Sequence, residues 1–371
     1  MRNGKRLALV ITCGLAALAS AACADPVPLP PVPAAQPPQP DDGPKDPNGD
    51  PMRAYIPSTI SPEAAAIYAR YRPFLLGPGP AIARTPEAWA ANQAASEAAV
   101  NAGLAPFLKA TNPTVVETEM GGVKVLDIRP QGYKDDGSVL IHVHGGGFVY
   151  GSARSNLRAS VLMAQASGKR IISVDYTVAP KGDFRLVTDQ VTAVYKAVLA
   201  SGYKANHVGM FGESAGGTII SSTVFKIRDQ GLPLPAGIIL ISPATDLTGA
   251  GDTRVTLAWA DPVLRPGGAQ PGIDAYAAPA DQKNPYASAV YGDFTKGYPA
   301  TLIQGGTKEW LLSDMVRLNR AIRTAGGDST LDLYEGMPHG FPSLMNEAAE
   351  GRQAIGEELA FWKRRLKTGK R

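Results

Sequence analysis

A serine between glycines stands past the middle of the chain, in the sequence GESAG at residues 212–216. An apolar run at 207–211 precedes it and a helix-like run at 218–228 follows it. A G-x-S-x-G sequence between a strand and a helix is typical of a nucleophile elbow, a sharp turn that exposes the serine oxygen at the top of a sheet. Glycines are needed because the backbones approach closely there and leave no room for side chains. We therefore predict that Ser214 is a nucleophile.

A serine nucleophile needs a base within hydrogen-bond reach, and histidine is the usual choice. The chain has only four histidines. His142 lies inside an apolar run that predicts a strand, and His207 opens another, so we expect both to be structural. His339 lies in the loop GMPHGF at 336–341, which follows the last predicted strand. Such a loop can present a side chain at the edge of a sheet, and we predict that His339 is the base.

The fourth histidine, His144, begins a run of glycines, HGGGF at 144–148, directly after a predicted strand. Consecutive glycines let backbone N–H groups face a ligand, as an oxyanion hole requires while negative charge develops on a carbonyl oxygen. A phosphate-binding loop is the rival interpretation. It fails because the run contains neither G-x-x-x-x-G-K-[ST] nor a G-x-G-x-x-G that opens a helix. We therefore predict an oxyanion hole at this run.

An acid that orients the histidine should lie in a loop at the end of a strand. After the predicted strand at 301–303, the chain reads GGTKEWLLSD at 305–314. Glu309 occupies the loop position, whereas Asp314 lies five residues later and is expected inside the next helix. We favour Glu309 and keep Asp314 as the alternative. Either acid gives the order serine, acid, histidine, which is the order of α/β-hydrolases.

Short apolar runs alternate with helix-like stretches from about residue 114 onward. This alternation predicts an α/β catalytic domain at 114–371, with a mostly parallel sheet covered by helices on both faces. The predicted strands are 123–128, 139–143, 171–174, 208–211, 237–241, 301–303 and 331–334. The predicted helices are 154–167, 186–201, 215–228, 311–325 and 346–366.

One segment precedes the alternation of strands and helices, and another interrupts it. The sequences SPE at 61–63 and TPE at 85–87 each resemble a helix start, with a capping hydroxyl, a proline and an acid in the first turn. They predict two helices within 51–113, which either form a cap over the site or pack as plain core. Residues 246–298, rich in Gly, Pro, Ala and Asp, are either a long loop or a second, lid-like insertion.

The composition is that of a globular protein, with 44% hydrophobic and 19% charged residues in a chain of 371. The net charge is +4, but clusters of basic residues lie at the two ends and the body between them is nearly neutral. This distribution argues against a nucleic-acid partner. The C-terminal basic cluster is interpreted as a solvated helix end, which the helix dipole favours, rather than as a membrane-binding patch.

The first 24 residues resemble a signal peptide, because a basic start precedes an apolar run and the sequence ACA at 22–24 fits a cleavage site. Acylation of Cys23, as in a lipoprotein, is one alternative, and a retained membrane anchor is another. Cys13 and Cys23 are the only cysteines, so the mature chain is expected to form no disulfide and no thiolate metal site. Residues 25–50 hold ten prolines and predict a disordered linker. We expect an exported protein, periplasmic or secreted.

Four motifs in one order resemble a known family. HGGGF at 144–148, DYTVAP at 175–180, GESAGG at 212–217 and GMPHGF at 336–341 together resemble the hormone-sensitive-lipase family of α/β-hydrolases. Bacterial members are carboxylesterases and lactone hydrolases of the alpha/beta hydrolase fold-3 type. The resemblance covers roughly residues 60–366 and implies an α/β-hydrolase fold with an N-terminal helical cap.

The resemblance also implies roles for individual residues. Ser214 would be the nucleophile, His339 the general base and Glu309 the acid, at a position where Asp is more usual. The oxyanion-hole N–H groups would come from the backbone of Gly145, Gly146 and Ala215. This sequence departs from the family pattern at residue 181, where lysine replaces the usual glutamate. The departures bear on fine specificity more than on the class of reaction.

The sequence thus predicts a serine carboxylesterase that hydrolyses short- to medium-chain esters, with lactones as further substrates. Phe148 and Trp310 are predicted to line a modest apolar acyl pocket. No metal or organic cofactor is expected. An amidase or peptidase with the same catalytic residues, or a small-molecule receptor on the same fold, stays open as an alternative. The retained histidine of the GMPHGF loop favours an enzyme over a receptor. The oligomeric state is not predicted.

Overall fold

The structure is a computed structural model, and it describes residues 43–77 and 82–369. The predicted signal peptide, its cleavage site and Cys23 lie outside the described residues, as do residues 25–42 of the predicted linker. The described part begins with a turn at Asp46 and a short 3-10 turn. The carboxylate of Asp46 accepts the backbone N–H groups of Asn48 and Asp50, and a 3-10 turn follows at Met52–Ala54.

Eight strands of the described chain form one sheet, in the order β1-β2-β4-β3-β5-β6-β7-β8. Strands β1 and β2 pair antiparallel, as do β2 and β4, whereas every pair from β4 to β8 across the sheet is parallel. The strand bounds are β1 (Thr114–Met120), β2 (Val123–Arg129), β3 (Val139–Val143), β4 (Arg170–Val174), β5 (Val208–Glu213), β6 (Gly237–Ile241), β7 (Thr301–Gly306) and β8 (Ser329–Tyr334). The carboxyl ends of the parallel strands therefore meet at one edge, where active sites of such sheets lie.

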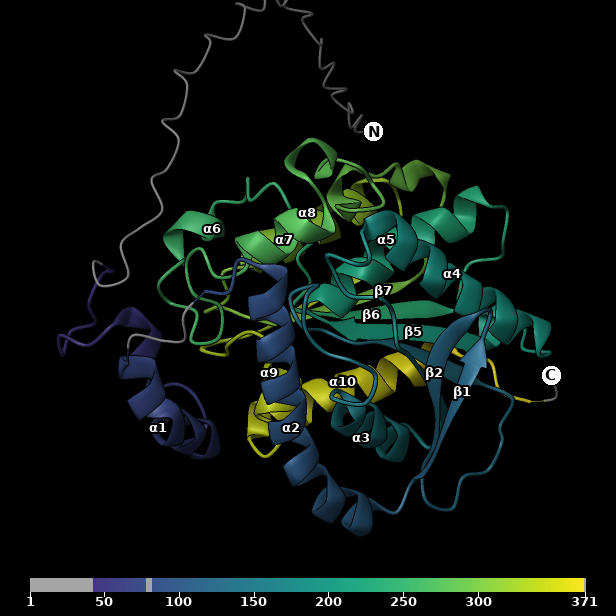
Figure 1. Cartoon of the computed structure of the whole chain (residues 1–371), viewed down its shortest axis with the longest axis horizontal. Coiled ribbons are helices and arrows are strands. Elements are labelled where there is room, and N and C mark those ends of the chain that lie inside the picture. Colours follow the sequence, from purple (N-terminus) through teal and green to yellow (C-terminus); the bar gives the residue numbers. More distant parts are fainter. Residues whose placement is uncertain (1–42, 78–81, 370–371) are drawn as a thin grey trace, which may run out of the picture. The chain divides into compact units, whose positions relative to one another are not determined.

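Helices cover both faces of the sheet, as the sequence predicts (Figure 1). One face is covered by α4 (Phe184–Ala200), α5 (Ala215–Asp229) and α8 (Leu312–Thr324), and the other by α3 (Leu157–Ser167) and α10 (Ala349–Arg365). Strands β3 and β6 are buried along their whole length. Strands buried on both faces are near-continuous Val, Ile and Leu runs, which is why these segments could be recognised without alternation of polar residues.

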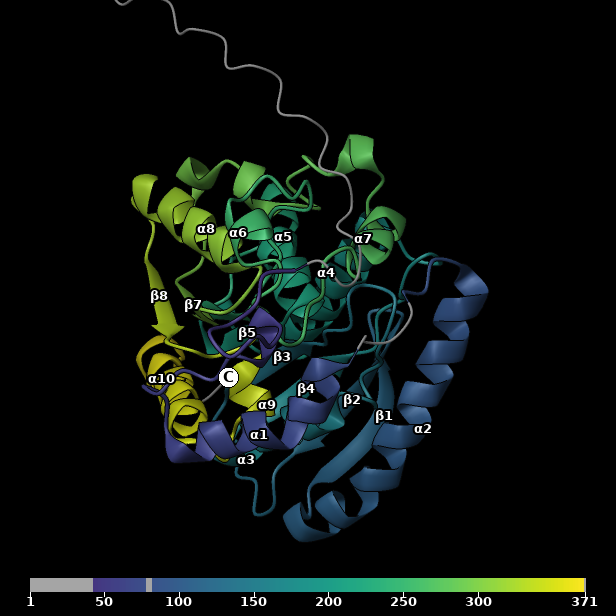
Figure 2. The same ribbon diagram turned by 90° about the vertical axis from the view of Figure 1, so that its left-hand side faces the viewer.

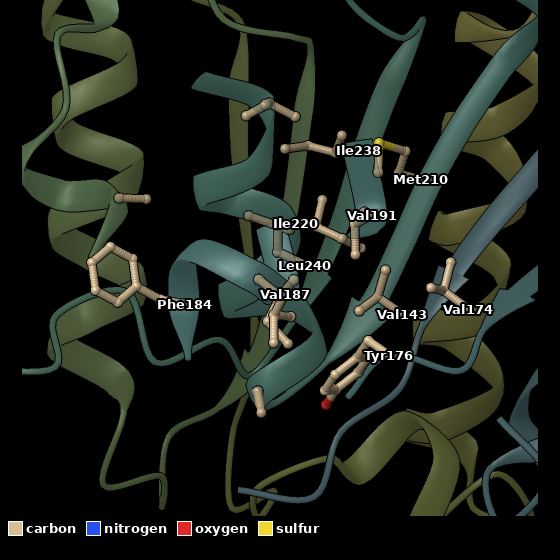
Figure 3. Close-up of a cluster of buried hydrophobic side chains, with 14 of the residues drawn as sticks. Val143, Val174, Tyr176, Phe184, Val187, Val191, Met210, Ile220, Ile238 and Leu240 are labelled. Carbon is tan, nitrogen blue, oxygen red and sulfur yellow. The ribbon is translucent and has the colours of Figure 1, made fainter. Parts of the chain in front are cut away.

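The larger apolar cluster lies between the sheet and helices α4 and α5 (Figure 3). In it, Val143, Met210 and Leu240 of three neighbouring strands pack toward Val187 of α4 and Ile220 of α5. Burial of each such side chain stabilises the fold by about 1.5–3 kcal/mol. The cluster packs β3, β5 and β6 against these helices, and the glycine run and Ser214 follow the ends of β3 and β5.

The two N-terminal helices are present. Helix α1 (Pro62–Leu76) begins where Ser61 accepts the N–H of Ala64, and α2 (Pro86–Thr111) begins where Thr85 accepts the N–H of Ala88. Figure 2 shows α1 near α10, and the side chain of Ser61 donates to Glu350 of that helix. Helix α2 packs on the outside of α3. No helix in the described ranges is long and apolar enough to span a bilayer.

The segment between β6 and β7 departs from the strand–helix alternation, as the sequence indicates. It contains two short helices, α6 (Thr253–Thr256) and α7 (Gln270–Tyr276), and 3-10 turns at Pro279–Asp281, Ala289–Tyr291 and Phe294–Lys296. A further short helix, α9 (Phe341–Leu344), follows the His339 loop. Strand β1 is not among the predicted strands. It lies at the edge of the sheet with most of its side chains exposed, so it lacks the apolar run that marks the others.

Candidate active site

The turn from β5 into α5 has the geometry of a nucleophile elbow. Ser214 lies at φ 56° and ψ −124°, a conformation that non-glycine residues rarely adopt and that is held only where the surroundings enforce it. Its N–H donates to the carbonyl of Ile241 at the end of β6, at 2.8 Å. A Cβ atom at Gly212 would lie 2.6 Å from the carbonyl oxygen of Val143, and one at Gly216 would overlap the same oxygen. The flanking glycines are therefore required by this close backbone approach.

The glycine run after β3 lies against this elbow. A Cβ atom at Gly145 would be 2.9 Å from the carbonyl oxygen of Glu213 and 3.4 Å from the Cβ atom of Ser214. Gly146 has φ +119°, and its carbonyl accepts the N–H groups of Val149 and Tyr150, so the loop folds back on itself. The predicted oxyanion-hole segment and the predicted nucleophile are thus in direct contact.

Tyr176 of the DYTVAP motif fixes the start of the glycine run. Its hydroxyl donates to the carbonyl of His144 at 3.0 Å, and its ring stacks on the His144 ring with centroids 4.1 Å apart. Burial lowers the pKa of His144 to about 4, so this histidine is neutral at physiological pH. Asp175 accepts the N–H of Ala153 at 2.8 Å and holds the segment after the loop. These two neighbouring residues of the DYTVAP motif support the glycine run and the segment that follows it.

His339 and Glu309 lie side by side after β8 and β7. Nδ1 of His339 is 3.2 Å from Oε2 of Glu309, and the two side chains are 6% and 0% exposed. Burial alone would lower the pKa of His339, but the hydrogen bond and charge of Glu309, together with the charges of Asp261 and Glu213, raise the pKa overall. Burial raises the pKa of Glu309, although the histidine opposes this shift. The carboxylate is therefore placed to hold the imidazole and stabilise its protonated form.

The second oxygen of Glu309 is also held. Oε1 accepts the Ser242 hydroxyl at 2.8 Å and the Gly306 N–H at 2.6 Å. The same Ser242 oxygen accepts the N–H of Gly340, the residue after His339, at 3.0 Å. A Cβ atom at Gly305 would lie 2.9 Å from Oε1, so glycine at that position leaves room for the longer glutamate. Ser242 thus joins the acid to the histidine loop, a role that the sequence reasoning missed.

Asp314, the alternative acid, has a different partner. It lies in the first turn of α8, and its Oδ2 is 2.7 Å from the Arg254 guanidinium, with both side chains buried. It also accepts the N–H of Asp246. This pair links α6 of the insertion to α8.

Two further buried charged residues flank Glu309. Asp261 accepts the backbone N–H of Trp310 at 3.1 Å, and its charge contributes to raising the pKa of His339. The Lys308 ammonium donates to the Tyr55 carbonyl at 2.7 Å and lies 5.0 Å from the centroid of the Tyr68 ring. Lys308 therefore attaches the N-terminal segment to the loop of the acid. No pattern in the sequence indicates either contact.

The two predicted pocket residues are both buried. Phe148 directly follows the glycine run and stacks on Tyr276 of α7, with centroids 4.2 Å apart. The indole N–H of Trp310 donates to the Arg254 carbonyl at 2.7 Å. Both rings pack against the insertion between β6 and β7.

The two histidines expected to be structural have hydrogen-bond partners other than Ser214, Glu309 and His339. His142 is buried, and its Nδ1 lies 2.9 Å from the Ser173 hydroxyl, whereas Nδ1 of His207 is 3.0 Å from the Gly137 carbonyl. Among the residues that the structure describes, no group of three His, Cys, Asp or Glu side chains is arranged to hold a metal ion.

The sheet order, the elbow and the buried His–Glu pair define an α/β-hydrolase. The sequence profile of a family described as "alpha/beta hydrolase fold" matches residues 140–343. The chain belongs to this family, that of the hormone-sensitive-lipase-like α/β-hydrolases, and it is a carboxylic ester hydrolase.

Known relatives agree with this assignment. The chain is 31% identical over 234 residues to an acetyl-hydrolase of Streptomyces hygroscopicus, which covers 63% of this chain and 77% of the relative. An esterase of the bacterial hormone-sensitive lipase family has a crystal structure that matches with a TM-score of 0.72 at 27% identity, over 83% of this chain and 99% of that one. A protein named EstE5, in a crystal soaked with p-nitrophenyl butyrate, matches with a TM-score of 0.72 at 29% identity, over 82% of this chain and 99% of that one.

Proposed function

We propose that this chain is an exported serine carboxylesterase in which Ser214 is the nucleophile, His339 the general base and Glu309 the acid that orients it. The observation that carries this proposal is the buried contact between His339 Nδ1 and Glu309 Oε2. Both residues follow strands whose carboxyl ends lie at the same edge of the sheet as the elbow of Ser214.

In the first step, the Ser214 oxygen attacks the acyl carbon of the ester while His339 takes the hydroxyl proton. Glu309 keeps the imidazole proton on Nδ1 and stabilises the imidazolium that forms. The tetrahedral intermediate collapses, the C–O bond to the alcohol breaks, and His339 returns the proton to the leaving alcohol. Water then attacks the acyl-enzyme with His339 again as base, which releases the acid and restores the serine.

The oxyanion would be stabilised by the N–H groups of Gly145, Gly146 and Ala215. Ala215 is the first residue of α5, so its N–H has no acceptor within its own helix and shares the positive end of the helix dipole. The contact between Gly145 and the elbow supports this assignment. Loss of one such donor typically raises the barrier by about 3–4 kcal/mol.

The substrates we propose are esters of short to medium acyl chains, with lactones as a second class. The descriptions of two relatives, an acetyl-hydrolase and a protein whose crystal was soaked with a butyrate ester, support short chains. Phe148 and Trp310 would supply apolar surface for the acyl group. The N-terminal helices at 51–113 and the insertion at 246–298 would shape the pocket together, because Arg265 of the insertion donates to the carbonyl of Gly77 at the end of α1.

The leader supports export to the periplasm or the medium, either as a free protein that starts at Asp25 or as a lipoprotein acylated on Cys23. Mass spectrometry of the mature N-terminus separates the two forms. A first residue at position 25 gives a free protein, and an acylated cysteine at position 23 gives a membrane-tethered one. An unprocessed Met1 would contradict export by this route.

The test of function is hydrolysis of p-nitrophenyl esters from acetate to palmitate. We expect wild type to prefer the short esters and Ser214→Ala to fall to background. Ser222→Ala is the matched control, since this serine is buried in the same helix and its hydroxyl has no partner within the described residues. Activity of Ser214→Ala equal to wild type would contradict the nucleophile. Faster turnover of palmitate than of acetate would contradict the acyl preference.

A further inference from the structure

A cavity lies on the face of the sheet that α3 and α10 cover. Its volume is about 220 Å³, and it is bounded by those two helices, the ends of β5 and β6, and α9. Its walls include Leu162 and Met163 of α3, Phe211 and Ile241 of the strands, and Ile355 of α10. Successive side chains of a strand point to opposite faces, so Glu213 at the end of β5 shares the face of Phe211 and projects into this cavity.

Two carboxyl groups face this apolar space. Glu358 of α10 is 2% exposed, and its Oε1 has no hydrogen-bond partner in the described part of the chain. Glu213 is half-buried and lines the same cavity. Burial, together with the charges of Glu213 and Asp332, raises the pKa of Glu358 to about 8. A buried carboxyl group without a partner is costly as an anion, so it either takes up a proton or acquires a cation.

His339 is the basic group whose charge acts on Glu213, where it opposes the rise in pKa that burial causes. Among the described residues that line the cavity there is no lysine or arginine. His142 also lines it, but burial lowers its pKa to about 3, so the imidazole is neutral. Its Nδ1 is held by the hydroxyls of Ser160 and Ser173. The cavity therefore offers carboxyl oxygens as hydrogen-bond acceptors, and Oε1 of Glu358 has no partner among the described residues.

We propose that this cavity is a binding site for a small organic ammonium ion. The ammonium group would lie between Glu213 and Glu358 and donate to their carboxylates, while the alkyl part would contact the apolar walls. A volume of 220 Å³ equals roughly seven water molecules at about 30 Å³ each, which suits an alkylammonium of a few carbons. A bare metal ion fits poorly, because a hard divalent cation needs about six oxygen ligands and these walls are mostly apolar.

The proposed site lies next to the segments that carry Ser214 and His339. Glu213 directly precedes Ser214, and its Oε1 lies 2.6 Å from the position that a Cβ atom of Gly340 would occupy. Its carboxyl group also hydrogen-bonds the Ser343 side chain in α9. An ammonium ion bound at Glu213 would thus sit against the segment that carries His339, on the other side of the sheet from α4 and α5.

The test is calorimetric titration of the full chain with n-butylammonium, which requires no turnover. We expect saturable binding to wild type and to Ser214→Ala, and at least tenfold weaker binding to Glu358→Gln. Glu357→Gln is the matched control, because this neighbouring side chain is exposed, and it should bind like wild type. n-Butanol, of similar size but uncharged, should bind at least tenfold more weakly.

A second variant tests the place of binding without changing charge. Ala159 of α3 is half-buried in the cavity wall, and Ala159→Leu should fill the space and weaken binding at least tenfold. Thermal unfolding verifies that each variant is folded. The proposal would be overturned if wild type showed no saturable binding, if Glu358→Gln or Ala159→Leu bound as tightly as wild type, or if n-butanol bound as well as n-butylammonium.

Discussion

Two isosteric substitutions should separate the acid of the active site from the acid of the fold. Glu309→Gln removes the charge next to His339, and Asp314→Asn removes the charge next to Arg254. The two positions lie in the same stretch of sequence and both side chains are fully buried. If Glu309 orients the histidine, the first change lowers activity and the second lowers stability.

The expected loss for Glu309→Gln follows from its contacts. The amide oxygen can still accept from Ser242 and Gly306, which directs the amide N–H₂ group toward Nδ1 of His339. That geometry selects the wrong imidazole tautomer, and an equivalent change in a serine protease lowers kcat by about 10⁴. The corresponding rise in the barrier is about 5 kcal/mol. The free energy of unfolding should change little, because no buried charge is left without a partner.

Asp314→Asn should behave in the opposite way. The Arg254 guanidinium is 4% exposed, so loss of its carboxylate partner leaves a buried charge. Breaking such a pair costs about 3–5 kcal/mol of unfolding free energy, and the retained amide favours the lower end. Activity per folded molecule should stay within about threefold of wild type. A small shift of α8 should change the reaction barrier by no more than about 0.6 kcal/mol.

The assays are kcat for p-nitrophenyl acetate and urea denaturation of both variants. Circular dichroism gives the folded fraction by which each rate is divided. The role of Glu309 is contradicted if Asp314→Asn loses as much activity per folded molecule as Glu309→Gln, or if Glu309→Gln keeps wild-type kcat.

Three further predictions concern the support of the site. Ser242→Ala removes a hydrogen bond to the Glu309 carboxylate. It should lower kcat about 10-fold and leave KM unchanged, because a hydrogen bond to a charged group contributes about 1.5 kcal/mol. An unchanged kcat would contradict this role of Ser242. Gly216→Ala places a Cβ atom on the Val143 carbonyl and should lower the unfolding free energy by about 3 kcal/mol, measured in urea; a loss below about 1 kcal/mol would refute the close approach. Burial lowers the pKa of Lys308 to about 8, so between pH 8 and 10 this lysine is protonated in the unfolded chain but largely neutral in the folded one. The unfolding free energy should therefore rise with pH, by at most about 1.4 kcal/mol per pH unit. Lys308→Met should lose this rise, and parallel plots of unfolding free energy against pH for the two proteins would contradict the prediction.

Much of the fold could be predicted because the relevant signals are local. The buried parallel strands are apolar runs, and the helix starts carry their own capping residues, as at Ser61 and Thr85. The fold class and the α/β-hydrolase family are confirmed by the sheet order and the family match. Strand β1 was missed because an exposed edge strand is stabilised by its pairing with β2, a contact between segments that a local pattern does not contain.

The site could be predicted only in part. Ser214 and His339 lie in short motifs, and Glu309 was favoured because loops after parallel strands share one edge. The same rule could have indicated Ser242, which directly follows β6. Lys308 could not be found in this way, because its partners are backbone carbonyls of a segment more than 250 residues away, and carbonyls carry no sequence signal. The cavity behind the elbow likewise exists only in the packed structure.

Mass spectrometry of the enzyme quenched during hydrolysis of p-nitrophenyl butyrate would show directly whether Ser214 becomes acylated. Covalent catalysis by Ser214 predicts a transient acyl-enzyme. We expect a mass increase of one butyryl group on the peptide that contains residues 212–217, and none in Ser214→Ala. A butyryl group on another peptide would contradict Ser214 as the nucleophile. So would steady hydrolysis without any acylated enzyme in a rapid quench, if Ser214→Ala also kept the wild-type rate.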